Sequence, residues 1–220
     1  MRWWRWAPEK RATEKRAPEA RPDPDEAVAR FWRRWHEELP RIAARLGDND
    51  PRQADELLGA LVAELDPRLR GSVERGAVAS YALVVSGAED PELRPLTDAW
   101  LRAAPVPDLV WEYHDSVPPV PDPTEVTVRL GARPVPLAEV RVTARVDDAA
   151  GLVDLVVHHP VFAELDAGTT EAVMFLAVEA TLGERVAGGR LRRVVSSPTE
   201  PADAVDLMAL RSLVHRLGGP

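Results

Sequence analysis

The sequence predicts an α+β protein, with a mixed or antiparallel sheet of about six strands and helices packed mainly on one face. Apolar residues recur at three- and four-residue spacing in some segments, as in amphipathic helices, and alternate singly in others, as in half-buried strands. The strands also follow one another in runs, which favours antiparallel or mixed pairing over a strictly alternating β-α order.

The composition is typical of a globular protein, with 45% hydrophobic and 29% charged residues in 220. The chain contains no cysteine, which excludes disulfides, a thiolate nucleophile and cysteine-based metal sites. No run approaches the roughly 18 apolar residues of a membrane-spanning helix, and the start lacks the apolar core of a secretory signal. We therefore expect a cytoplasmic protein.

Residues 1–22 contain three prolines, many charged side chains and no aliphatic residue larger than alanine, so we expect a disordered arm. The arm begins with the aromatic and basic residues Arg2, Trp3, Trp4, Arg5 and Trp6. Such a segment suits weak contact with an anionic membrane. The alternative is a dispensable extension.

The charge is unevenly distributed. Residues 1–23 hold seven Lys or Arg and four Asp or Glu, so the overall charge of −8 leaves −11 for the rest. Because phosphate binding needs a basic face, no nucleic acid partner is expected.

The first elements after the arm are predicted to be helices opened by Asp-Pro pairs. One begins at Asp23-Pro24 and is kinked or divided at Pro40, another begins at Asp50-Pro51, and a third follows Asp90-Pro91. Residues 78–85 are apolar on both faces, which predicts a central strand, and residues 108–114 form another strand. We treat residues 23–220 as one domain, with a possible division into two lobes at the proline-rich loop near 118–124.

From residue 126 the pattern changes to period two. Residues 126–130 predict a strand, and residues 139–158 predict a β-hairpin with a short turn at 147–151. A nearly all-apolar helix over 170–182, ended by Gly183, is expected to be buried. A strand over 191–196 and an amphipathic helix from Pro201 complete the chain.

Several short motifs together resemble an uncharacterised bacterial protein family. They are the Phe-Trp-x-x-Trp-type helix motif Phe31-Trp32-Arg33-Arg34-Trp35, Ser86-Gly87 after an apolar strand, Leu101-Arg102-Ala103-Ala104-Pro105 before Trp111, and the later Leu182-Gly183-Glu184. The resemblance implies an intracellular α+β fold and carries over no catalytic residue.

One polar cluster is a candidate catalytic or metal site. It consists of Glu112, His114, Asp154, His158 and His159, and if the strands that carry them pair, Asp154, His158, Glu112 and His114 could converge on one face. The alternative is that they lie at strand ends, where solvent satisfies them. Asp154 and His158 are about 13 Å apart along a strand, so we expect the protein to bind no stoichiometric metal. We also expect no cofactor, and intact folding after His158 or His159 is changed to alanine.

Two further features have a structural and a functional interpretation. Trp32 and Trp35 fall on the apolar stripe of the first helix, where they either pack in a core or form an exposed ridge for a partner. Glu184 follows a helix C-terminus, which disfavours a carboxylate, so we expect a buried arginine or a peptide amide to hold it. The alternative is a catalytic acid, which would need a second carboxylate or histidine in reach.

Nucleophile elbows, Walker A loops, Gly-rich dinucleotide turns and paired metalloprotease histidines do not occur. The sequence therefore favours a non-enzymatic interaction or regulatory domain that binds a protein or itself. A small hydrolase or metal-dependent enzyme, and a peripheral membrane protein attached through the arm, remain alternatives.

Overall fold

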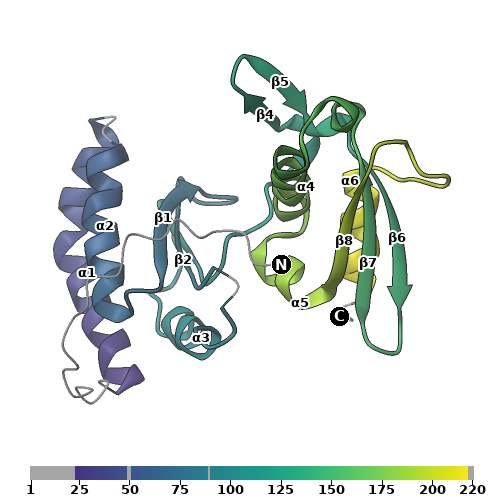
Figure 1. The fold of residues 1–220 in the computed structure, drawn as a ribbon. Coiled ribbons are helices and arrows are strands. Elements are labelled where there is room, and N and C mark those ends of the chain that lie inside the picture. The colour runs from purple at the N-terminus through teal and green to yellow at the C-terminus, as the bar shows by residue number, and fades with distance from the viewer. Residues whose placement is uncertain (1–22, 49–50, 89, 218–220) are drawn as a thin grey trace, which may run out of the picture.

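The computed structural model describes residues 23–48, 51–88 and 90–217 and shows an α+β fold (Figure 1). Its helices are α1 (Pro24–Gly47), α2 (Pro51–Leu65), α3 (Arg94–Arg102), α4 (Ala167–Leu182), α5 (Glu184–Arg190) and α6 (Leu207–Leu217). Short 3-10 helices lie at Pro123–Glu125, Leu137–Glu139 and Pro160–Glu164. The strands are β1 (Arg70–Arg75), β2 (Tyr81–Ser86), β3 (Trp111–His114), β4 (Thr127–Leu130), β5 (Arg133–Pro136), β6 (Arg141–Asp147), β7 (Leu152–His158) and β8 (Leu191–Ser197).

The strands form three sheets, where the sequence predicted one sheet of about six strands. In the first, β2 lies between antiparallel β1 and parallel β3. β4 and β5 pair as an isolated hairpin, and β7 lies between antiparallel β6 and parallel β8. The segment from 115 to 126 contains four prolines, which cannot donate ladder hydrogen bonds, and it separates the first sheet from the others.

Two strands were missed because their sequences lack a strand signal. β1 reads Arg-Gly-Ser-Val-Glu-Arg, with a single large aliphatic residue, and β5 reads Arg-Pro-Val-Pro. Both are edge strands, where proline and charged residues are tolerated because one side of the backbone needs no partner. Their pairing was therefore decided by the neighbouring strand.

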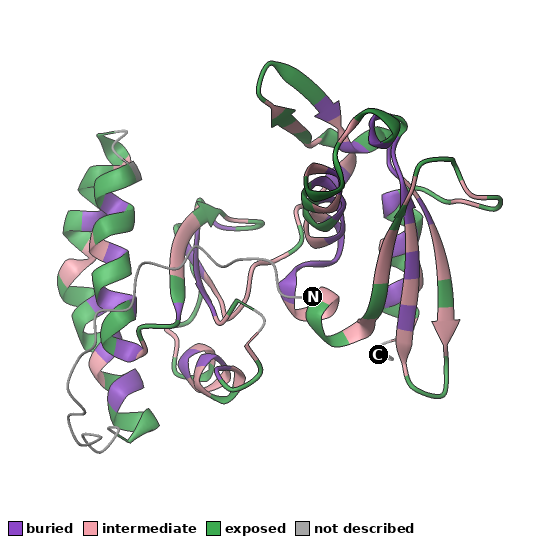
Figure 2. Cartoon of the chain, in the orientation of Figure 1, coloured by how far each residue is buried: buried purple, intermediate pink, exposed green. Residues whose placement is uncertain are grey.

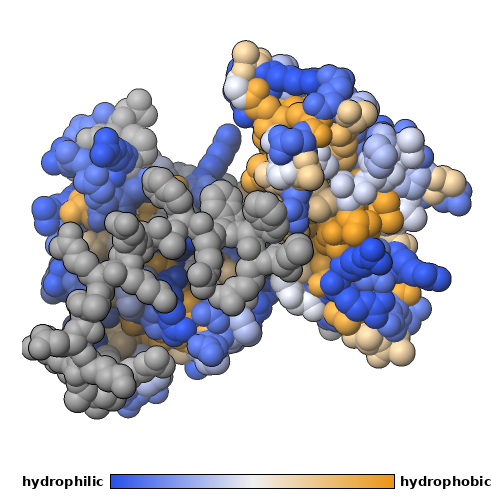
Figure 3. Space-filling model, viewed as in Figure 1, coloured by the Kyte–Doolittle hydropathy of each residue, from blue (hydrophilic) through white to orange (hydrophobic). Residues whose placement is uncertain are grey.

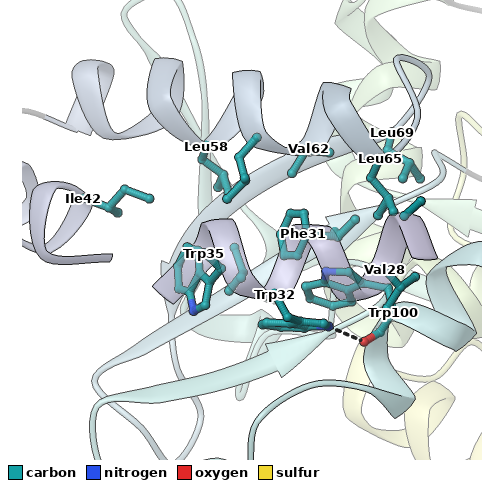
Figure 4. Packing of buried hydrophobic residues seen from close by; sticks show 14 of the residues in the cluster. Val28, Phe31, Trp32, Trp35, Ile42, Leu58, Val62, Leu65, Leu69 and Trp100 are labelled. Carbon is teal, nitrogen blue, oxygen red and sulfur yellow. Dashed lines mark hydrogen bonds between the residues drawn. The ribbon is translucent and has the colours of Figure 1, made fainter. Parts of the chain in front are cut away.

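The first hydrophobic cluster joins α1, α2 and α3 to the first sheet (Figure 4). At the start of α1 the Asp23 side chain accepts a hydrogen bond from the Asp25 amide, as predicted. Pro40 was predicted to kink or divide this helix; it does not divide it, since α1 is helical throughout, and a kink stays a prediction. Asp50 lies outside the described residues, so its capping role stays a prediction.

Trp32 and Trp35 both belong to this cluster. The Trp32 ring stacks on Trp100 at 4.9 Å and its indole N–H donates to the Trp100 carbonyl at 3.1 Å (Figure 4). Trp35 is fully buried, edge-on to Trp111 at 5.1 Å. Of the two interpretations of this stripe, packing in a core is therefore confirmed and the exposed ridge is wrong, because both indoles are buried against the sheet and α3.

The second cluster joins α4 and α6 to the β6–β8 sheet. The predicted hairpin over 139–158 is present as β6 and β7, paired from Arg141–His158 to Asp147–Leu152. α4 is less buried than expected, because Phe175 and Leu176 on its outer side are each 48% exposed. Figure 3 shows hydrophobic surface on this part of the molecule.

A polar junction connects the two clusters, which appear as separate groups of buried residues in Figure 2. The buried Glu184 carboxylate, at the start of α5, accepts hydrogen bonds from the Ser86 hydroxyl at 2.6 Å and the Val117 amide at 2.9 Å. Gly183 has a φ of 74°, and a Cβ there would lie 2.8 Å from Pro119. The Leu-Gly-Glu motif therefore serves this junction, and a peptide amide does bind Glu184.

Candidate functional site

Four residues of the predicted polar cluster lie in two different sheets, and His159 caps the 3-10 helix Pro160–Glu164. Glu112 and His114 are on β3, which pairs with β2, whereas Asp154 and His158 are on β7, between β6 and β8. The condition for convergence, pairing of the two strands, is not met.

The polar atoms of the β7 group are used in structural bonds. Asp154 forms an ion pair with Arg192 at 2.7 Å, and Nδ1 of His158 lies 3.0 Å from the Ser197 carbonyl. The buried His159 ring accepts the Val161 amide at Nδ1, and its Nε2 lies 3.1 Å from the Pro136 carbonyl. Within residues 23–48, 51–88 and 90–217, no three His, Cys, Asp or Glu side chains are grouped so as to hold a metal ion.

Glu112 instead fixes the loop between β1 and β2. Its carboxylate accepts the backbone amides of Ala77, Val78 and Ala79 at 2.8, 3.0 and 3.0 Å, and it lies 3.0 Å from Nε2 of His114. Burial would raise the pKa of Glu112, but the bonds to His114 and to these amides outweigh it and lower the pKa to about 2. At neutral pH Glu112 is therefore a charged anchor of this loop.

Gly76 allows the loop to close around that carboxylate. A Cβ at this position would lie 2.5 Å from the Ala79 carbonyl oxygen and 3.2 Å from Cδ of Glu112. Backbone approach this close requires glycine.

Asp108 fixes the neighbouring loop, which precedes β3. Its Oδ1 atom accepts the amides of Val110 and Trp111 at 2.7 and 2.8 Å, and these bonds lower the pKa of the carboxyl group. The two loops are joined by the Ser80 amide, which donates to the Leu109 carbonyl at 3.1 Å, and by the Tyr81 amide, which donates to Val110 at 2.9 Å. The backbone of both loops is thus held by internal hydrogen bonds.

These loops expose four aliphatic side chains, which we call the loop surface: Val78, Val106, Leu109 and Val110. The first three are 87%, 88% and 86% exposed, and Val110 is 48% exposed. Side chains this exposed protrude from the surface. Exposed aliphatic residues grouped on fixed backbone are typical of interaction sites.

Sequence reasoning missed this surface because it assigned Val78, Leu109 and Val110 to the predicted strands 78–85 and 108–114. The available signal was composition: residues 76–80 are small and uncharged, and Val106 lies between two prolines. Both features indicate loops, and an aliphatic residue in a loop is seldom covered.

The junction between the clusters is polar but too small for a substrate. Arg185 forms ion pairs with Asp98 and Asp115, beside a cavity of about 10 Å³ that is also lined by Arg94 and Thr97. That volume holds about one water molecule. The junction therefore has a structural role.

Trp3, Trp4 and Trp6 lie outside the described residues, so their interaction role stays a prediction. In the part of the chain that is described, no helix is long and apolar enough to cross a membrane. No protein-family model, no curated protein and no solved structure matches this chain.

Proposed function

We propose that this chain is a non-enzymatic cytoplasmic interaction domain that binds a protein partner through the loop surface. The observation that carries the proposal is the exposure of Val78 and Leu109 on loops that Glu112 and Asp108 bind through backbone amides, with the equally exposed Val106 earlier in the second loop.

Rigid loops favour binding. The amides of Ala77, Ala79 and Trp111 already have internal acceptors, so covering them leaves these N–H groups paired, and the fixed backbone loses little conformational entropy on association. Because the side chains protrude, the complementary surface is a concave apolar site. Burying each aliphatic side chain contributes about 1.5–3 kcal/mol, equivalent to at least about tenfold in Kd.

The residues of the predicted polar cluster also support a non-enzymatic function. Asp154, His158 and His159 make structural bonds, and Glu112 is surrounded by three amides and a histidine. None of these groups faces the small cavity at the junction.

Site-specific photo-crosslinking in host cells tests the proposal. A photoreactive residue at Leu109 should give one discrete adduct with another protein, and combined Val78→Ser and Val106→Ser substitutions should remove it. The same residue at the exposed Glu200 is the matched control. Identical adducts from both positions, or an adduct that survives the double substitution, would contradict the proposal.

A further inference from the structure

A groove of about 390 Å³ lies between the end of α1 and the β1–β2 hairpin. It is lined by Leu46, Val73, Tyr81, Ser80, Glu74 and Arg75. The Tyr81 ring packs against Trp111 at 5.3 Å, and Trp111 in turn packs against Trp35. One wall of the groove is therefore an aromatic ring supported by the core.

We propose that this groove binds the aromatic and basic segment Arg2–Trp6 of the same chain. The groove would bind this segment whether or not the loop surface has a partner.

The side chains of the groove match that segment chemically. Leu46, Val73 and Tyr81 form an apolar surface on which an indole ring can pack. Arg75 at the rim can stack on an indole face. Glu74 is exposed, and its Oε2 atom makes no hydrogen bond within the described residues, so it can accept a guanidinium group of Arg2 or Arg5.

The chain is long enough to reach the groove. α1 starts at Pro24, so Leu46 near its far end lies about 33 Å from the start of the helix at a rise of about 1.5 Å per residue. The 17 residues from Ala7 to Asp23 span up to about 56 Å when extended. The opposite charges of residues 1–23 and the remaining chain, +3 and −11, also favour contact between them.

Paramagnetic NMR on the full chain tests this directly. The chain has no cysteine, so Ala7→Cys provides a unique site for a spin label. The expected result is loss of the amide signals of Leu46, Val73 and Tyr81, with those of the β6–β8 sheet retained. Combined Trp3→Ala, Trp4→Ala and Trp6→Ala substitutions should restore the lost signals, and Glu74→Lys should restore them in part.

Three results would overturn the inference. The first is broadening that does not single out the groove, and the second is broadening that persists without the three tryptophans. The third is broadening of an isotope-labelled chain by a separate spin-labelled chain, which would show binding between two copies. Cosedimentation with phosphatidylserine vesicles while the groove signals remain unbroadened would assign the segment to membranes instead. None of these outcomes bears on the photo-crosslinking at Leu109.

Discussion

Replacing Glu112 with glutamine should destabilise the protein in a pH-dependent way. The pKa of Glu112 is lowered from 4.5 to about 2 in the folded chain. At about 1.4 kcal/mol per unit, the folded state favours the charged carboxylate by about 3 kcal/mol. Glutamine keeps one acceptor oxygen but loses the charge, so we expect Glu112→Gln to cost about 2–3 kcal/mol at pH 7.

The sign of the pH dependence follows from the lowered pKa. The contribution of Glu112 is fully present above pH 4.5 and is lost as pH falls toward 2. Urea unfolding of the wild type and of Glu112→Gln at pH 7 and pH 3 should therefore give a difference in unfolding free energy that shrinks at the lower pH. Amide exchange of Ala77, Val78 and Ala79 should also become faster in the variant.

Glu200→Gln is the matched control, because this glutamate is exposed and its replacement should cost under about 0.5 kcal/mol. A difference for Glu112→Gln that stays constant between the two pH values would refute the assignment of the carboxylate as a charged anchor. Unchanged exchange of the three amides would refute its role in holding the loop.

Three further predictions concern the core, the junction and the buried histidine. Trp35→Ala should cost about 3–5 kcal/mol of unfolding free energy in urea, because the indole is fully buried. Arg34→Ala should cost under about 1 kcal/mol, because the Arg34 side chain is half-exposed. Similar urea midpoints for the two variants would show that this face of α1 is misassigned. Glu184→Ala should lower stability by about 1.5–3 kcal/mol, because a hydroxyl and an amide lose their acceptor, and an unchanged melting temperature would contradict this. Burial lowers the pKa of His159 from 6.5, so its contribution to the free energy of unfolding is present above pH 6.5 and is lost as pH falls through the folded pKa. His159→Ala should therefore be less stable than the wild type at pH 8, contrary to the sequence-based expectation of intact folding, and should lack that part of the pH dependence. A wild-type pH profile of stability in the variant would disprove this.

Much of the local structure could be predicted from neighbouring residues alone. The Asp23-Pro24 pair predicted the start of α1, and the alternation of apolar and polar residues on either side of a short turn predicted the β6–β7 hairpin. Glu184 was expected to need a partner because a carboxylate is disfavoured after a helix end, and it binds the Val117 amide. These features depend on contacts within a few residues or on the chemistry of one side chain.

The candidate site depended on which strands pair, and strand pairing is not encoded locally. Glu112 and Asp154 each carry the pattern of a functional carboxylate, but pairing of β3 with β2 gives Glu112 three loop amides, while pairing of β7 with β8 brings Asp154 to Arg192. The same cause hid the loop surface, since Val78 and Leu109 are exposed only because the ladder between β2 and β3 begins at Tyr81 and Trp111.

The sequence by itself determined the α+β class, the amphipathic helices and the stripe that buries Trp35, because periodicity and caps act over a few residues. Tertiary structure alone decided that the strands form three sheets, that Glu184 joins the two clusters, and that the loops carrying Val78 and Leu109 are joined through the Ser80 amide. The reason is that hydrogen bonds between distant segments are chosen by the packing of the whole chain, and many pairings satisfy the same local pattern.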